Sequence, residues 1–201
     1  MDFHDELGHR LTRISMMTEL IKLKIGNSFA DINSMLDQIS ENSKQVYNGA
    51  KDFIWSIDPT QDSFYELMIR LKDFGDDLFG NTNVRFEVTG LDESLQNTLL
   101  NMDWKKHLTL IIKEGMNNSL KHSNGNKVLL STHIEGDEVE VKLIDNGEGF
   151  TDDLNKKGFG LKNMKTRAEK LNASLFIKTK PGEGTKILIK GKFPVKSLNY
   201  A

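Results

Sequence analysis

The stretch Asp145-Asn146-Gly147-Glu148-Gly149-Phe150 decides how this chain is interpreted. It follows an alternating apolar and polar run that is typical of a strand, and it places a carboxylate before two glycines spaced one apart. Glycines at 147 and 149 let the backbone pass close to a flat ring, while the carboxylate of Asp145 accepts a hydrogen bond from an exocyclic amine. The stretch therefore predicts an adenine site at the end of a strand.

A helix predicted over 104–121 precedes that strand and carries two further polar residues. Glu114 and Asn118 are four residues apart, so both side chains project from one helix face. The side-chain oxygen of Asn118 suits a hard cation, and magnesium on a triphosphate is the natural candidate. Downstream, the glycine-containing run 158–164 opens another helix, whose free N–H groups suit phosphate oxygens. Three parts of one nucleotide site thus follow in order.

The order of these motifs resembles a known ATP-binding domain. Glu-x-x-x-Asn, Asp-x-Gly-x-Gly and Gly-x-Gly-Leu are followed by Gly182-Glu183-Gly184-Thr185, as in the domain shared by histidine kinases, DNA gyrase, the heat-shock-90 chaperones and MutL. Each motif alone is weak, because Gly-x-Gly is more often a simple turn. Four motifs in this order, over roughly the last two thirds of the chain, make the resemblance specific.

The resemblance implies a role for each matching residue. Asp145 would hold the adenine amine, with Thr185 supporting it through water. Asn118 would bind magnesium, and Glu114 would orient a magnesium-bound water. The remaining ATP contacts would come from the glycines after Asp145, from the end of the predicted helix 104–121 and from the run 158–164: Gly147, Gly149, Lys121, His122, Gly158, Gly160 and Leu161.

The first part of the chain shows helical periodicity twice. Apolar residues recur at steps of three and four between residues 3 and 25, and again between 32 and 57, with Gly26 ending the first helix. A lone hairpin cannot bury its apolar stripe, so we expect two copies to form a four-helix bundle, which makes the protein a homodimer. Pro59 disfavours helix at the residue before it. We therefore expect a helical hairpin domain over 1–60 and a second domain over 61–197.

The second domain mixes helices with strands. Its patterns predict helices over 64–79 and 104–121, and the strands 84–88, 127–134, 138–144, 174–179 and 185–189. Mostly antiparallel strands with helices in this mixture predict a two-layer α/β sandwich, with the helices on one sheet face. The expected fold class of the chain is therefore α+β.

Charge and composition exclude several function classes. The chain has 27 basic and 29 acidic residues without a long run of either, so it lacks the electrostatic footprint of nucleic-acid binding. It has no cysteine, which excludes disulfides, thiol nucleophiles and cysteine metal sites. No apolar run approaches the length of a membrane span. We expect a cytoplasmic piece that contacts neither nucleic acid nor membrane.

The head of the first helix carries the residues that distinguish a kinase from a simple ATP clamp. His4-Asp5-x-x-Gly8 before such an ATP domain resembles the phosphoacceptor box of two-component histidine kinases, in the subgroup of nitrate-sensing and membrane-fluidity-sensing kinases. The resemblance implies that His4 is phosphorylated from Mg-ATP and passes the group to an aspartate on a response regulator receiver domain. A neutral imidazole can attack the γ-phosphorus through one nitrogen while Asp5 takes the proton from the other.

His9 departs from the pattern of that subgroup, which usually reads His-Asp-x-x-x-Gln. The glutamine is thought to orient the water that hydrolyses the regulator's aspartyl phosphate. Asp5 and His9 are four residues apart, so they can meet on one helix face, which favours a protonated His9 without a lone pair for water. We therefore expect weak phosphatase activity at neutral pH. The alternative is an exposed His9 that only touches the regulator.

Alternatives remain at the level of function and of single residues. An ATP-gated dimeric interaction module and an anti-sigma-type protein serine kinase share the ATP motifs, although neither needs the hairpin that begins with His4-Asp5. Glu114 can also be read as part of a surface salt bridge, Lys121 as solvated, and His122 as a partner of the helix dipole. Because the chain opens three residues before His4, we expect it to be a piece of a longer bacterial sensor with sensory or membrane segments upstream.

Overall fold

A computed structural model describes residues 63–150 and 159–193 throughout, together with residues 13, 14, 16, 17, 20, 21, 32, 34–36, 38, 39, 42, 46, 49 and 55. The chain divides into two compact units, Met1–Asp58 and Pro59–Ala201. No helix in this described part is long and apolar enough to cross a membrane.

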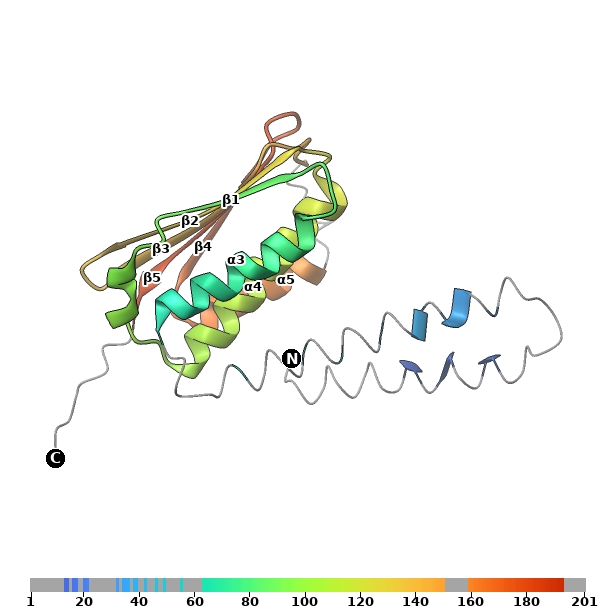
Figure 1. Ribbon diagram of the computed structural model, residues 1–201, viewed down its shortest axis with the longest axis horizontal. Coiled ribbons are helices and arrows are strands. Elements are labelled where there is room, and N and C mark those ends of the chain that lie inside the picture. Colours follow the sequence, from blue (N-terminus) through green and yellow to red (C-terminus); the bar gives the residue numbers. More distant parts are fainter. Residues whose placement is uncertain are drawn as a thin grey trace. The chain divides into compact units, whose positions relative to one another are not determined.

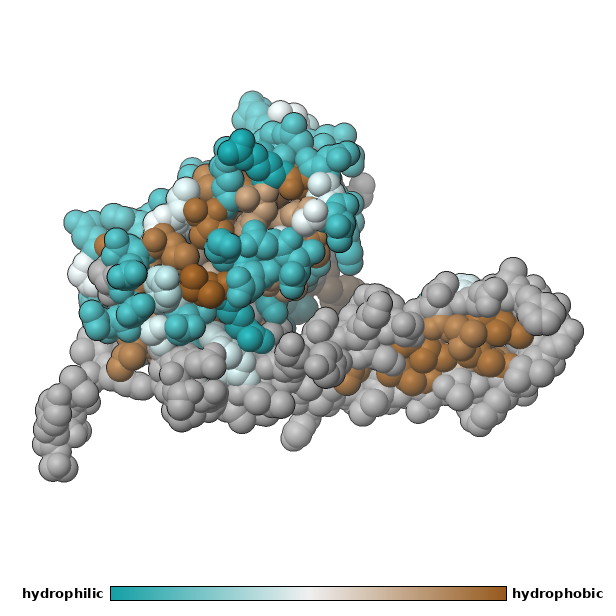
Figure 2. All heavy atoms as spheres, viewed as in Figure 1, coloured by the Kyte–Doolittle hydropathy of each residue, from teal (hydrophilic) through white to brown (hydrophobic). Residues whose placement is uncertain are grey.

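The described residues of the first unit are helical. The side-chain amide of Asn42 donates to the sulfur of Met17 at 3.8 Å, which joins two helical segments. Three large apolar side chains stay exposed, with 63%, 43% and 50% of their surface accessible in Met16, Leu20 and Leu36. Figure 2 shows an apolar area, in brown, on the described part of this unit. Apolar surface of this kind is typical of a face that packs against another chain.

The second unit contains three helices, one short 3₁₀ helix and five strands among its described residues (Figure 1). In chain order these are α3 (Phe64–Phe79), β1 (Arg85–Thr89), η2 (Glu93–Asn97), α4 (Met102–His122), β2 (Lys127–Glu135), β3 (Glu138–Asp145), α5 (Phe159–Lys170), β4 (Ser174–Thr179) and β5 (Thr185–Lys192). Side-chain oxygens of Ser63 and Asn101 cap the N-termini of α3 and α4 by accepting from backbone N–H groups at 3.1 and 2.9 Å. The 3₁₀ helix is the one element here that the sequence patterns did not predict.

The five strands form one mixed sheet in the order β1-β2-β3-β5-β4. β1 pairs with β2 in parallel, and the other neighbours are antiparallel. The three helices cover one face of the sheet (Figure 1). Within this unit, the predicted α+β class with helices on one sheet face is confirmed.

Alternation along the strands places an apolar core between the two layers. On β3, every second residue from Val139 to Asp145 is buried, and Ile187 and Ile189 of β5 lie beside them in register. Helix α4 contributes fully buried side chains to the same core: Leu108, Ile111, Ile112 and Met116. The only carboxylate in this buried row is Asp145, at the end of β3.

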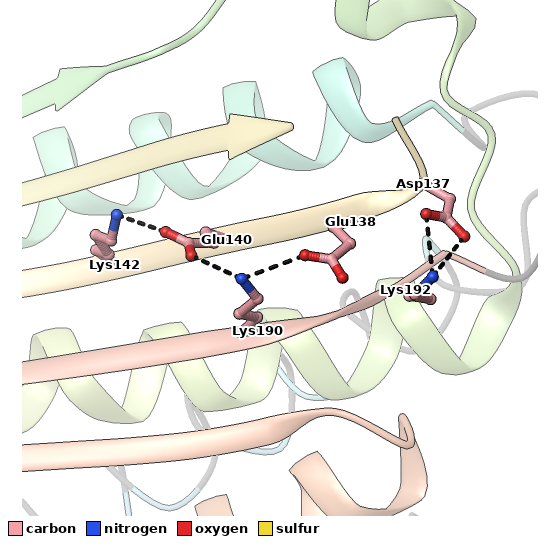
Figure 3. A network of polar contacts seen from close by, with 6 residues as sticks. All are labelled: Asp137, Glu138, Glu140, Lys142, Lys190 and Lys192. Carbon is pink, nitrogen blue, oxygen red and sulfur yellow. Dashed lines mark hydrogen bonds and ion pairs between the residues drawn. The ribbon is translucent and has the colours of Figure 1, made fainter. Parts of the chain in front are cut away.

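The other face of the sheet carries charge. Figure 3 shows Lys190 of β5 between Glu138 and Glu140 of β3, at 3.2 and 3.3 Å. Lys142 also pairs with Glu140, at 2.6 Å. Hydrogen bonds from Lys142 and then Lys190 hold the pKa of Glu140 below its usual value. Lys192 reaches Asp137 of the neighbouring turn at 3.2 Å, so all six of these charges take part in ion pairs, four in one chain and two in a separate pair.

Candidate functional site

The Asp145 carboxylate is held by three donors from three parts of the fold. Only 6% of the residue is exposed. Oδ1 accepts from the backbone N–H of Gly147 at 3.0 Å and of Thr185 at 3.2 Å. Oδ2 accepts from the Ser119 hydroxyl of α4 at 3.0 Å. A carboxylate has about four acceptor positions, so Oδ2 can still accept one more donor, such as an exocyclic amine.

The loop after Asp145 is fixed against the end of α4. The side-chain oxygen of Asn146 accepts from the backbone N–H groups of Asn126 and Lys127, at 3.0 and 2.9 Å. A Cβ at residue 147 would overlap the carbonyl oxygen of Ser123, so only glycine fits there. The N–H of Glu148 donates to that same carbonyl at 2.6 Å. Glycine at residue 147 is thus explained by close packing against Ser123, in addition to the close approach to a ring that the sequence suggested.

The second glycine of the motif meets the loop between β4 and β5. Gly149 has a φ of +60°, which side chains rarely adopt, and a Cβ there would overlap the carbonyl oxygen of Lys180. The N–H of Phe150 donates to the Thr179 hydroxyl at 2.9 Å, and that hydroxyl lies 3.3 Å from the Thr185 hydroxyl. The two sequence motifs, around Asp145 and Thr185, therefore form one site.

The C-terminal half of α4 supplies the polar residues expected to face phosphates and metal. Glu114 and Asn118 are half-buried, whereas Lys121 and His122 are exposed in the last turn. A Cβ at Gly160, near the start of α5, would overlap Oε1 of Glu114, so α4 and α5 meet at this point. Among the described residues, no three His, Cys, Asp or Glu side chains gather to hold a metal ion.

The structure brings most of the predicted nucleotide residues to one end of the second unit. Asp145, Gly147, Gly149 and Thr185 lie together, and Glu114 lies against Gly160, followed by a half-buried Leu161. Four predicted residues lie outside the described part of the chain: His4, Asp5, His9 and Gly158.

Sequence reasoning missed two of the residues that shape this site. Ser119 and Thr179 hold Asp145 and Phe150 through side-chain hydroxyls. For Ser119 a signal existed, because it is a polar residue four positions after Gly115 on the buried face of α4. For Thr179 no local pattern distinguishes the hydroxyl from those of other strand threonines.

Comparisons with known proteins agree at both ends of the chain. Residues 1–62 match the family described as "Histidine kinase", and residues 105–196 match "Histidine kinase-, DNA gyrase B-, and HSP90-like ATPase". Sensor histidine kinase LiaS of Bacillus subtilis (strain 168) is 24% identical over 190 residues, which are 94% of this chain and 51% of LiaS. Sensor protein VraS of Staphylococcus aureus (strain COL) is 39% identical over 85 residues, 42% of this chain and 24% of VraS. The chain thus spans about half the length of LiaS.

Solved structures share the fold. The histidine kinase domain of the blue-light activated histidine kinase EL346 from Erythrobacter litoralis has a TM-score of 0.56 at 14% identity, covering 95% of this chain and 92% of that domain. Histidine kinase AdeS of Acinetobacter baumannii has a TM-score of 0.58 at 16% identity, covering 94% and 97%. Since both family matches and both sensor relatives agree, this chain belongs with the sensor histidine kinases, and its second unit carries the ATP-binding domain that the second family match describes.

Proposed function

We propose that the chain is the catalytic core of a sensor histidine kinase, which phosphorylates His4 from Mg-ATP and passes the group to an aspartate of a response regulator. The observation that carries this proposal is the buried Asp145 carboxylate, fixed by three donors with one acceptor position left on Oδ2. Asp145 accepts from the adenine amine there. The alternating β3, which ends at Asp145, and its register with β5 place this acceptor beside Thr185.

The phosphate end of ATP lies along the C-terminal half of α4. Asn118 would hold the magnesium ion of Mg-ATP through its side-chain oxygen, a ligand type that suits this cation. Glu114 orients one of these waters. Lys121 and His122, exposed in the last turn, face the phosphates together with backbone at the start of α5.

Phosphoryl transfer to His4 balances without a further reactant. One imidazole nitrogen attacks the γ-phosphorus, and the bond from that phosphorus to the β–γ bridging oxygen breaks to release ADP. Asp5 takes the proton from the other nitrogen. The phosphohistidine then gives its phosphoryl group to a carboxylate of the regulator's receiver domain.

The first unit forms a homodimer through its apolar face. Exposed Met16, Leu20 and Leu36 support this, since a single hairpin leaves them in water. Sedimentation of the whole chain should therefore give a dimer, and a monomer over the micromolar range would contradict it.

Acid lability tests the proposed reaction. After incubation with γ-labelled ATP, the chain should carry label that survives alkali and is lost in acid, because a phosphohistidine N–P bond is acid-labile. His4→Gln should remove the label while ATP binding persists, since glutamine keeps helix propensity but is no nucleophile. Acid-stable label would indicate a serine kinase, and no label with intact ATP binding would indicate an ATP-gated interaction module.

A further inference from the structure

Where α4 and α5 meet, the side chain of Glu114 occupies the space beside Gly160. Gly160 is the second residue of α5. A Cβ built on it would overlap Oε1 of Glu114 and lie 3.2 Å from Cδ. The carboxylate therefore occupies the space that the side chain of any other residue at position 160 would fill.

The backbone gives no other reason for a glycine at this position. Gly160 lies inside a helix, and it is not one of the glycines with positive φ. Glycine in a helix is less favourable than alanine, because it loses more conformational freedom on folding. The neighbour that excludes a methyl group is the far end of a flexible side chain, so an added methyl group displaces the Glu114 carboxylate rather than the helix.

The position of Glu114 depends on this gap. Among the described residues, none forms a hydrogen bond or ion pair with its carboxylate. Two features determine the position of the Glu114 carboxylate. One is the space left beside Gly160, and the other is the positive end of the α5 helix dipole, which favours a negative charge near the first turn. A half-buried carboxylate held in this way moves when the gap is filled.

We infer that Gly160 is a positioning residue. Because it has no side chain, the Glu114 carboxylate can lie where it orients the magnesium-bound water. This rests on the proposed function. It assigns Gly160 a role through Glu114 in addition to the backbone contact to phosphate at the start of α5. Alanine at residue 160 keeps the backbone N–H and hence the binding of ATP, whereas a displaced Glu114 affects the rate of the chemical step.

Gly160→Ala tests the inference by separating rate from binding. We expect the rate constant of autophosphorylation at saturating ATP to fall about 10- to 100-fold, as for a misplacement of about 1 Å. The dissociation constant for ATP, measured by calorimetry, should change by less than about two-fold. Thermal unfolding should show no loss of stability, because alanine is the better helix former. Gly49→Ala is the matched control, since a Cβ at residue 49 meets nothing within 4 Å, and it should leave the rate unchanged.

A double-mutant cycle with Glu114→Asp gives the deciding result. The shorter side chain withdraws the carboxylate from the gap, so Gly160→Ala should slow the reaction in the unmutated background but not in the Glu114→Asp background. If the chain autophosphorylates, two results would overturn the positioning role. One is that Gly160→Ala slows the reaction by the same factor in both backgrounds, and the other is that ATP affinity falls by the same factor as the rate. Absence of phosphohistidine in the unmutated chain would instead overturn the proposed function.

Discussion

At the scale of single residues, Asp145 shows how a buried charge is retained at a binding site. Removing a carboxylate from water is costly unless donors replace the water, and here two backbone N–H groups and the Ser119 hydroxyl do so. Because Ser119 donates its only proton to Asp145, both side chains present acceptors to an incoming base. Two acceptors of this kind require a donor from the ligand, which in the proposed function is the adenine amine.

Asp145→Asn should weaken ATP binding by about 1.5–3 kcal/mol, the range for hydrogen bonds to charged groups. The amide oxygen can still accept from Gly147 and Thr185, which turns the amide nitrogen toward Ser119 and the adenine. The Ser119 hydroxyl can adapt by accepting from that nitrogen, whereas the adenine amine is a donor and cannot. Isothermal calorimetry measures the loss. Ser119→Ala is the graded comparison, because it removes one of three donors and should cost less. Binding near that of the unmutated chain in Asp145→Asn would exclude Asp145 from the adenine site.

His107, on α4, should make the stability of the second unit depend on pH. It is 5% exposed, and its Nδ1 has no hydrogen-bond partner in the described structure. Burial is the largest cause that lowers its pKa, to about 4; the facing charges are Lys170, Arg167 and Lys106, which also lower it, and Asp103, which raises it. Since the unfolded chain has a pKa of about 6.5 at this residue, it binds the proton more readily than the folded chain.

The stabilisation that follows is complete above about pH 6.5 and is lost as the pH falls toward 4, by at most about 3 kcal/mol. Urea unfolding between pH 4 and 7 measures it. His107→Leu should flatten this part of the profile, whereas His133→Asn, which changes an exposed histidine of β2, should not. The same slope in all three proteins would contradict the assignment to His107.

At the scale of elements, the outer sheet face combines satisfied and unsatisfied charges. Lys190 lies between two glutamates (Figure 3), whereas Lys178 of β4 lies directly opposite Lys186 of β5. Within the described residues, neither Lys178 nor Lys186 forms an ion pair. Like charges directly opposite each other weaken the pairing of two strands. Removing one of these two like charges should therefore increase the stability of the β4–β5 pairing.

Lys178→Glu should stabilise the second unit by about 0.2–1 kcal/mol, because it replaces a like-charge pair with an opposite-charge pair across β4 and β5. Thermal unfolding at low and high salt measures the gain, which salt should reduce. Lys190→Glu is the matched control on the same face. It breaks the ion pairs to Glu138 and Glu140 and should destabilise the protein. Equal effects of the two substitutions would show that cross-strand charge does not decide the outcome.

At the scale of the whole molecule, we expect the balance between kinase and phosphatase activity to depend on His9, which lies outside the described residues. The sequence places Asp5 four residues away, a spacing that we expect to favour protonated His9, which cannot accept a hydrogen bond from a water. Dephosphorylation of the regulator should rise as the pH increases above about 6.5. His9→Gln should increase it at neutral pH without loss of autophosphorylation, and His9→Ala should lose what remains. Phosphate release from purified regulator between pH 6 and 8.5 measures this, and equal, flat profiles for the three proteins would refute the role.

The long periodic segments and the motif order could be predicted from the sequence. The helix expected over 104–121 is α4, within two residues at its start, and the strand expected over 138–144 is β3, which continues one residue further to Asp145. These features succeed because helix and strand periods are local properties of the chain, and glycine requirements are local too. The sequence by itself thus determined the α+β class of the second unit and the family of ATP-binding motifs.

Only the tertiary structure decided how the motifs hold one another. Ser119 and Asp145 are 26 residues apart in the sequence, and Asp145 and Thr185 are 40 apart. Nevertheless, the Ser119 hydroxyl and the Thr185 N–H both donate to the Asp145 carboxylate. Gly160 meets Glu114 because α5 packs on α4, and Lys178 meets Lys186 because of the β4–β5 register. Such pairs follow from sheet register and helix packing, which one-residue shifts would change completely, so no local pattern encodes them.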